Sequence, residues 1–183
     1  MERTEQQYRA AIGKCKELFL RKAQDYGTSW SVLRLPSVTD QLYIKAKRIR
    51  TLEETGENRV GESIESEYIG LINYSVIALI LLEREAEGRD PFEPLALPAD
   101  ELAAQYDAAV QQAWETLLRK NHDYGEAWRE MRMASYTDLI LMKLLRIQQI
   151  EANEGRTQVS EGVASGYIDI LNYAAFALIR MGE

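Results

Sequence analysis

The feature that most constrains the fold of this chain is an internal repeat. The stretch KAQDYGTSW, residues 22–30, returns 98 residues later as KNHDYGEAW, residues 120–128. An ungapped alignment of residues 22–53 with residues 120–151 has 13 identities in 32 positions. A sequence repeated at a constant offset encodes a repeated structural unit, so we expect two copies of one unit to pack against each other.

The composition is that of a globular protein with enough apolar material for a core. Hydrophobic residues make up 46% and charged residues 28% of the 183 residues, so stability requires neither a disulfide nor a structural metal. The single cysteine, Cys15, excludes an intrachain disulfide, and the single histidine, His122, excludes a histidine-rich metal centre. A bound metal would therefore have carboxylate ligands, which favours magnesium, manganese or calcium.

The charge and the apolar segments narrow the classes of partner. The formal net charge is −7, and an acidic chain without a long basic stripe is a poor candidate for direct binding of duplex nucleic acid or a membrane surface. The polar start MERTEQQYRA lacks a signal-peptide core, and the longest apolar run, Tyr74–Leu82, is shorter than the ~20 residues of a membrane span. We therefore expect a cytoplasmic protein, and the sequence leaves a homodimer open.

Glycines and capping motifs predict where the first helix of each copy ends and where the second begins. Apolar residues recur at helical spacing in the first segments, and Gly27 and Gly125 follow them as expected of helix C-termini. The motifs SVTD and SYTD, which begin at Ser37 and Ser135, match a capping pattern that would start the second helices and account for the polar residues there. Asp100 is a candidate cap for the first helix of the second copy.

No convincing two-residue alternation marks a β-strand, so the predicted fold is all-α. The third helices are expected to begin near Glu62 and Glu161 and to continue through LINYSVIALILL and ILNYAAFALIR. The expected architecture is a six-helix, bundle-like fold made of two pseudo-symmetric three-helix repeats. We assign the repeats to residues 1–87 and 100–183, joined by a proline-rich connector at residues 88–99.

Most identities between the copies are polar, which apolar packing alone does not explain. Asp25 and Asp123 fall in the last turn of the first helices, where a negative charge opposes the helix dipole. Each aspartate either pairs with a nearby cation or binds a metal or ligand. Three cations also recur in each copy and either pair with acids or hold phosphate: Arg34, Lys45 and Arg48 in the first, and Arg132, Lys143 and Arg146 in the second.

The third helices are expected to carry a polar face within an apolar sequence. At 100° per residue, four polar residues of the second copy fall on one arc: Glu161, Ser165, Asp169 and Asn172. The first copy has these residues at the same positions: Glu62, Ser66, Gly70 and Asn73. We expect both asparagines to be buried and hydrogen-bonded. The face either locks the copies together through the asparagines or lines a ligand site that they help to form.

Taken together, these motifs resemble the bacterial and phage family named nucleotide modification associated domain 1. The resemblance rests on DYG…W, the Lys-x-x-Arg helix and the Glu and Asn-Tyr positions of the third helix, and it covers nearly the whole chain as two tandem copies. The family name implies a link to nucleotide metabolism or modification. The third helix is also loosely similar to the acidic helix of MazG-like all-α nucleoside triphosphate pyrophosphohydrolases, which hold magnesium between carboxylates of facing helices.

The resemblance implies a set of acidic ligands that this chain keeps only in part. The family's third helix reads Glu-x-x-x-Asp-x-x-x-Asp-x-x-Asn-Tyr, and its two aspartates fall on Ser66 and Gly70 in the first copy. In the second copy they fall on Ser165 and Asp169. Glu161 and Asp169 would lie about 12 Å apart along a helix, too far to bind one ion without a ligand between them.

The sequence supports two hypotheses of different kinds. In the first, the protein binds a nucleotide or a similar phosphorylated small molecule between its halves, and any catalysis is magnesium-dependent hydrolysis of a phosphoanhydride. The catalytic residues would be Asp123, Glu161 and Asp169, with Glu62 as a metal ligand of the first copy. Because the second copy keeps Asp169 where the first has Gly70, we expect any metal chemistry to be asymmetric and to depend on the second copy. In the second hypothesis, the protein is a non-catalytic helical scaffold or regulatory module whose repeated polar residues form interfaces.

Overall fold

The computed structural model describes residues 2–90, 92–158 and 161–183, and within these ranges the chain is helical without β-strands. The helices are α1 (Glu2–Tyr26), η1 (Ser29–Val32), α2 (Leu35–Thr55), α3 (Ile64–Ala86), α4 (Ala99–Tyr124), η2 (Ala127–Glu130), α5 (Met133–Ala152) and α6 (Val163–Met181), where η marks a short 3-10 helix. The order α1–η1–α2–α3 recurs as α4–η2–α5–α6, which confirms the predicted all-α fold of two three-helix copies.

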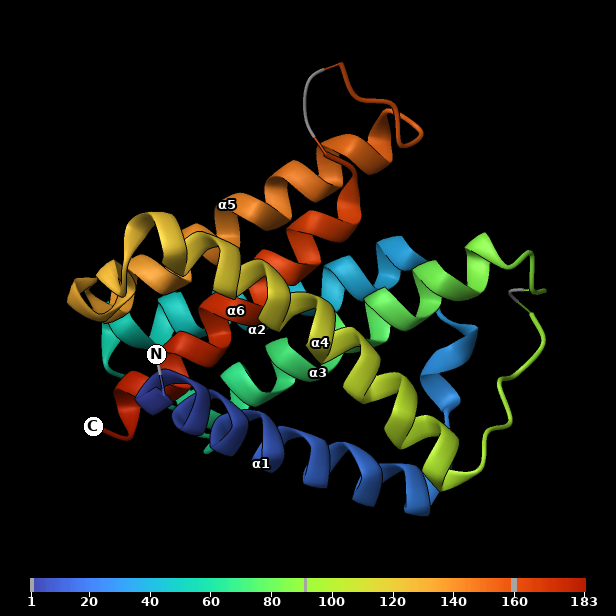
Figure 1. Cartoon of the computed structure of the whole chain (residues 1–183), viewed down its shortest axis with the longest axis horizontal. Coiled ribbons are helices and arrows are strands. Elements are labelled where there is room, and N and C mark those ends of the chain that lie inside the picture. The colour runs from blue at the N-terminus through green and yellow to red at the C-terminus, as the bar shows by residue number, and fades with distance from the viewer. Residues whose placement is uncertain (1, 91, 159–160) are drawn as a thin grey trace.

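The third helix of each copy lies at the centre of the molecule. The helices α3 and α6 pack along each other, α2 packs on α3, α5 packs on α6, and α2 also packs on α5. The first helices, α1 and α4, contact each other and both central helices. In Figure 1, α1 (blue) runs along the lower edge and α5 (orange) along the upper edge, with α3 and α6 between them. Each copy therefore needs the other to cover its third helix.

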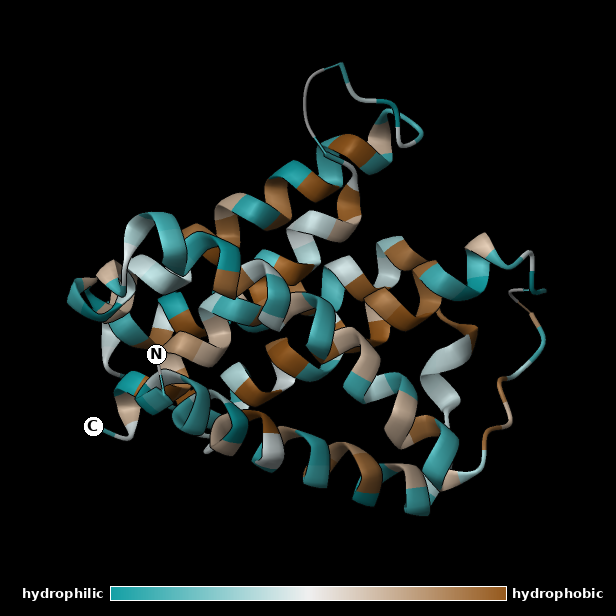
Figure 2. Cartoon of the chain, in the orientation of Figure 1, coloured by the Kyte–Doolittle hydropathy of each residue, from teal (hydrophilic) through white to brown (hydrophobic). Residues whose placement is uncertain are grey.

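The central helices are the most apolar part of the chain. Figure 2 shows hydrophilic and hydrophobic residues alternating along the outer helix α1, as expected of a helix with one face on the core. By length and composition, α3 is the one helix in the described ranges that could cross a membrane, and 67% of that apolar stretch is buried inside the protein. Burial of this extent is typical of a core helix.

The helix ends agree with the prediction at the glycines and differ from it at the caps. Gly27 and Gly125 follow α1 and α4 with φ angles of 64° and 61°, as predicted. Ser37 and Ser135, predicted to be N-caps, lie inside the first turns of α2 and α5, which begin two residues earlier. Asp100 likewise lies within α4. The capping predictions were wrong because apolar residues before each motif pack against the core and extend the helix.

Polar residues that recur in both copies join the copies reciprocally. The Thr39 hydroxyl lies 2.7 Å from a carboxylate oxygen of Glu151 and 2.7 Å from the hydroxyl of Tyr167. The equivalent contacts, at 2.9 and 3.0 Å, join Thr137 to Glu53 and to Tyr68. Every contact links one copy to the other, so the interface accounts for these identities.

The two asparagines make a second reciprocal set of contacts. Asn172 is 5% exposed, donates to a backbone carbonyl of α4 at 2.9 Å, and accepts from the Tyr8 hydroxyl at 2.9 Å. Asn73 is 9% exposed, donates to a carbonyl of α1 at 3.1 Å, and accepts from the Tyr106 hydroxyl at 2.8 Å. These contacts confirm the predicted burial and lock the halves together, because each asparagine binds a tyrosine of the other copy.

Candidate functional site

A pocket of about 510 Å³ lies in the first copy, between the C-terminal end of α1, η1, α2 and the N-terminal half of α3. Its walls combine aromatic rings, two lysines and several polar groups, which include Phe19, Lys22, Tyr26, Trp30, Lys45, Glu62, Ser66, Asn73 and Tyr74. All lining residues belong to the first copy. The cavity therefore lies within one copy, whereas the sequence predicted a site between the halves, with its chemistry in the second copy.

The repeated motif DYG…W builds one wall of this pocket. Helix α1 ends at Tyr26, and Gly27 donates its backbone N–H to the Ala23 carbonyl at 2.9 Å. Its φ of 64° is strained for a residue with a side chain, so the glycine lets the chain turn directly into η1. The turn places Trp30 against Phe19, with ring centroids 6.0 Å apart, and leaves the indole half-buried at the pocket.

Two lysines with little ion pairing reach the pocket. Lys22 is exposed and makes no ion pair within the described ranges. Lys45 makes one long ion pair, 3.4 Å from Nζ to Glu67 Oε2, and its Nζ lies 5.8 Å from the centre of the Tyr74 ring. Burial of part of the side chain, and then Tyr74, raise the pKa of Tyr26. A tyrosine hydroxyl is protonated at neutral pH, so Tyr26 is a hydrogen-bond donor there. The pocket thus presents cations and a donor to a negatively charged ligand.

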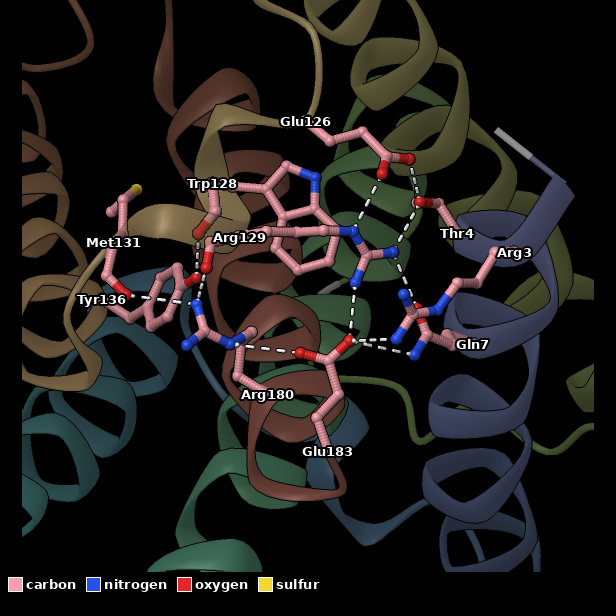
Figure 3. Close-up of polar contacts among 10 residues, drawn as sticks. All are labelled: Arg3, Thr4, Gln7, Glu126, Trp128, Arg129, Met131, Tyr136, Arg180 and Glu183. Atoms are coloured by element: carbon pink, nitrogen blue, oxygen red, sulfur yellow. Dashed lines mark hydrogen bonds and ion pairs between the residues drawn. The ribbon is translucent and has the colours of Figure 1, made fainter.

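The equivalent tryptophan of the second copy, Trp128, is buried against an aromatic ring. Phe176, which replaces Ile77, stacks on Trp128 with ring centroids 4.2 Å apart and planes 7° apart. The guanidinium of Arg129 lies over the same indole at 4.2 Å. Figure 3 shows how a polar network fixes this arginine through Thr4, Gln7, Glu126 and Glu183. Because the network ties η2 to α1 and the C-terminal residue, the indole is held closed over α6.

A carboxylate occupies the second copy where the first copy has a glycine. Asp169 replaces Gly70, and it is 8% exposed. One of its oxygens lies 2.5 Å from Lys120 Nζ and the other lies 2.7 Å from Lys143 Nζ. These two lysines are the repeat equivalents of the pair that lines the open pocket of the first copy: Lys22 and Lys45.

The first copy also has a buried acid, one helical turn earlier. Glu67 is 3% exposed and lies 2.5 Å from Arg48, whereas its repeat equivalent is Gly166. A β-carbon at Gly166 would lie 2.8 Å from Ile147 Cδ1, so the second copy has no room for an acid there. Arg146, the equivalent of Arg48, is exposed and makes no ion pair within the described part of the chain. The buried acid therefore stands at different positions of the third helix in the two copies, and it pairs mainly with an arginine in the first copy and with two lysines in the second.

Four predicted site residues lie outside this arrangement. Asp25 and Asp123 occupy the last turns of α1 and α4, as predicted, but neither pairs with a lysine or an arginine in the described ranges. Asp25 makes no ion pair in the described ranges, and Asp123 contacts His122 Nδ1 at 2.9 Å. Arg34 and Arg132 are exposed at the N-cap positions of α2 and α5 and do not line the pocket.

The acids predicted to hold magnesium are not assembled. Glu62 and Glu161 precede α3 and α6 rather than extending their polar faces, because the helices begin after the caps Ser63 and Gly162. The prediction of one continuous helical face was therefore wrong. Both oxygens of Asp169 already contact lysines, and no group of three Asp, Glu, His or Cys in the described ranges could hold a metal. These residues do not fit a magnesium centre, and we derive no catalytic step from them.

Sequence reasoning missed five residues that shape the pocket and its charge: Lys22, Tyr26, Trp30, Glu67 and Tyr74. Three of them stand in the repeated motif, so their identity in both copies was the available signal. The other signal was a double exchange on the third helix. Glu67 and Gly70 of the first copy, three residues apart, are replaced by Gly166 and Asp169 in the second. The lysine of the facing helix is the same in both copies.

The fold and the pocket define an all-α protein made of two tandem copies. The first has an open pocket, and the second, which we call the closed copy, has a stacked tryptophan and two paired lysines at the equivalent positions. Residues 22–82 and 120–181 match the model of the family described as nucleotide modification associated domain 1. These segments cover well over half of the chain, which therefore belongs to this family. The match does not show the looser similarity to MazG-like pyrophosphohydrolases. Comparisons with curated proteins and with solved structures find no match.

Proposed function

We propose that the pocket of the first copy binds a nucleotide or a similar phosphorylated small molecule. The observation that carries the proposal is its lining, which joins aromatic rings to two lysines with little internal pairing. A base stacked on an aromatic side chain contributes about 1–3 kcal/mol, and lysines bind phosphate through charge-assisted hydrogen bonds. The cavity of about 510 Å³ is also of a size typical of small-ligand sites.

The positions of the lining residues suggest how such a ligand lies. Trp30 and Tyr26 offer faces for a base at the end of α1, while Lys22 and Lys45 offer ammonium groups for phosphate. Glu62 stands at the rim, where its carboxylate can accept a hydrogen bond from a sugar hydroxyl. The family description, which refers to nucleotide modification, agrees with this class of ligand.

Hydrolysis is not part of the proposal, because the acids expected to perform it are apart or engaged with lysines. A non-catalytic scaffold is the second candidate, and the reciprocal contacts between the copies favour it. Those contacts involve Thr39, Asn73 and their repeat equivalents, so interface formation explains much of the polar repeat. It does not explain why Lys22 and Lys45 are directed at a cavity.

A thermal-shift screen of nucleoside mono-, di- and triphosphates, with and without Mg²⁺, tests the proposal. A ligand present at 100 times its Kd should stabilise the protein by about 2.7 kcal/mol. The Mg²⁺ arm shows whether a metal enters with the ligand. A pure scaffold would give no stabilisation by any nucleotide in either arm.

The repeat supplies a matched pair of control variants. Lys22→Gln should leave the melting temperature of the free protein unchanged, because Lys22 makes no ion pair with any residue that the structure describes, but it should reduce the nucleotide shift. Lys120→Gln should lower the melting temperature slightly, through the lost contact with Asp169, and leave the nucleotide shift intact. Equal effects of the two variants on the nucleotide shift would place the ligand elsewhere.

A further inference from the structure

Each copy contains two lysines, one arginine and one buried acid on facing helices, and the copies pair them differently. The cations are Lys22, Lys45 and Arg48 in the first copy and Lys120, Lys143 and Arg146 in the second. In the second copy the acid is Asp169, and it contacts both lysines, at 2.5 and 2.7 Å. In the first copy the acid is Glu67, which contacts Arg48 at 2.5 Å and Lys45 only at 3.4 Å. The acid therefore neutralises the lysines in the closed copy and the arginine in the open copy.

The structure around Gly70 shows what the first copy gains from losing the aspartate. A β-carbon built on Gly70 would lie 2.8 Å from Cε and 3.1 Å from Nζ of Lys45. The ammonium group of Lys45 thus rests directly over the bare helix backbone, at the edge of the pocket. In the second copy the Asp169 carboxylate receives the equivalent lysine. The first copy presents the equivalent lysines without a carboxylate at this position, and Lys45 keeps only its longer contact with Glu67.

We propose that Asp169 is a built-in substitute for the anionic group of the ligand, and that in the first copy a phosphate group displaces the flexible end of Lys45 from Gly70 and binds there, between Lys22 and Lys45. This inference rests on the proposed function, and it adds the position of the phosphate and a reason for the second copy to exclude phosphate at the equivalent place. Two phosphate oxygens replace the two carboxylate oxygens, each accepting from one lysine. The closed copy is in effect permanently occupied by its own side chain.

The exchange of these residues between the copies tests the proposal. The two variants are Gly70→Asp, which gives the first copy its own carboxylate, and Asp169→Gly, which removes it from the second. Lys45 is the group that a side chain at position 70 would displace, and its flexible end can move. Amine-directed acylation with mass-spectrometric readout reports the labelling rate of each lysine, with and without inorganic phosphate.

In the wild-type protein, we expect phosphate to protect Lys22 and Lys45 but not Lys120 and Lys143. Gly70→Asp should weaken phosphate protection in the first copy by about tenfold or more, as expected when a charge-assisted contact is lost. Asp169→Gly should create phosphate protection at Lys120 and Lys143. Protection that survives Gly70→Asp, or that fails to appear in Asp169→Gly, would overturn the substitution of carboxylate for phosphate.

The neutral variants Gly70→Asn and Asp169→Asn separate charge from volume and keep the test decisive if an exchange variant fails to fold. Gly70→Asn should preserve more phosphate protection than Gly70→Asp, and Asp169→Asn should expose the second pair of lysines to labelling. Equal effects of the Asn and Asp variants at position 70 would contradict an electrostatic substitute. Failure of the proposed function is distinguishable, since no nucleotide would then stabilise the wild-type protein even though phosphate protection moves between the copies.

Discussion

The two copies share a framework and differ in what fills the space beneath the repeated tryptophan. In the first copy, Trp30 is a half-buried wall of an open pocket, and Ile77 leaves room beside it. In the second copy, Trp128 is 6% exposed, stacked between Phe176 and Arg129. A repeated motif therefore does not imply a repeated site, because residues outside the motif decide whether the space is open.

The second difference is electrostatic and concerns the same space. The closed copy pairs its two lysines with a carboxylate. In the open copy, among the residues that the structure describes, Lys22 has no ion-pair partner and Lys45 has one contact of 3.4 Å. Duplication allows this division, since one copy can give up a site and stabilise the fold while the other keeps the charges that a ligand needs. Four predictions test the comparison, from the largest expected effect to the smallest.

The largest difference is expected at the repeated tryptophan. Trp128→Ala should lower the free energy of unfolding by about 3–5 kcal/mol, because the buried ring leaves a cavity and the Phe176 stack is lost. Trp30→Ala should cost about 1–2 kcal/mol, because its ring is only half-buried. Chemical denaturation measures both values, and equal losses would contradict the division into an open and a closed copy.

The two asparagines should differ less, since both are buried at the interface between the copies. Asn172→Leu should cost about 2–4 kcal/mol, because it leaves the buried Tyr8 hydroxyl without a partner and removes the side-chain hydrogen bond to a carbonyl of α4. Asn73→Leu should cost about 1 kcal/mol less, because Asn73 lines the pocket and is slightly more exposed than Asn172. Unchanged melting temperatures for both variants would show that these contacts do not hold the copies together.

Asp169→Asn should have a moderate effect on stability and none on the first-copy site. We expect a loss of about 1–2 kcal/mol, because the neutral amide accepts from only one of the two lysines and turns its N–H groups toward the other, while the solvation of Lys120 limits the cost. The nucleotide-induced stabilisation should remain, since the pocket is in the other copy. Under the magnesium-hydrolase hypothesis the variant would instead abolish Mg²⁺-dependent phosphate release, which a product assay on the same sample measures.

The smallest effect is the pH dependence of the interface, which should be alike in both copies. Burial raises the pKa of Glu53 and of Glu151 above the ordinary value of 4.5. The folded state therefore binds more protons than the unfolded state between that value and the raised pKa, so the contribution of these groups is greatest below pH 4.5 and falls as the pH rises through that window. Melting curves across the window should show a smaller decline in Glu53→Gln and Glu151→Gln, by similar amounts. If stability fell with rising pH by the same amount in both variants as in the wild-type protein, the pH dependence would not come from Glu53 and Glu151.

Part of the fold could be predicted because it depends on local periodicity and on the repeat. The six helices, the two glycine turns and the buried asparagines follow from patterns within each copy. The helix starts could not be predicted as well, since SVTD and SYTD satisfy a capping pattern but lie inside helices that packing extends. The starts of the third helices were also misplaced. The periodic pattern includes Glu62 and Glu161, but in the structure both residues precede the helix.

The candidate site was predicted only in part. Lys45 was among the expected phosphate-binding residues and lines the pocket, and Asn73 lines it while serving the interface. Asp25 and Arg34 were expected at a site and lie on the surface away from it. Because both residues are identical in the two copies, they indicated a repeated structural unit. Identity between two copies in one sequence does not show whether a residue binds a ligand or only lies on the surface.

The sequence by itself determined that this protein is two copies of one three-helix unit, because a repeated pattern of apolar residues and turn glycines folds the same way twice. Only the tertiary structure decided which copy is open. That outcome depends on contacts between residues far apart in the chain, such as Phe176 on Trp128 and Asp169 with Lys120. It also depends on the size and charge of whatever side chain faces the space, and neither is visible from the spacing of a motif.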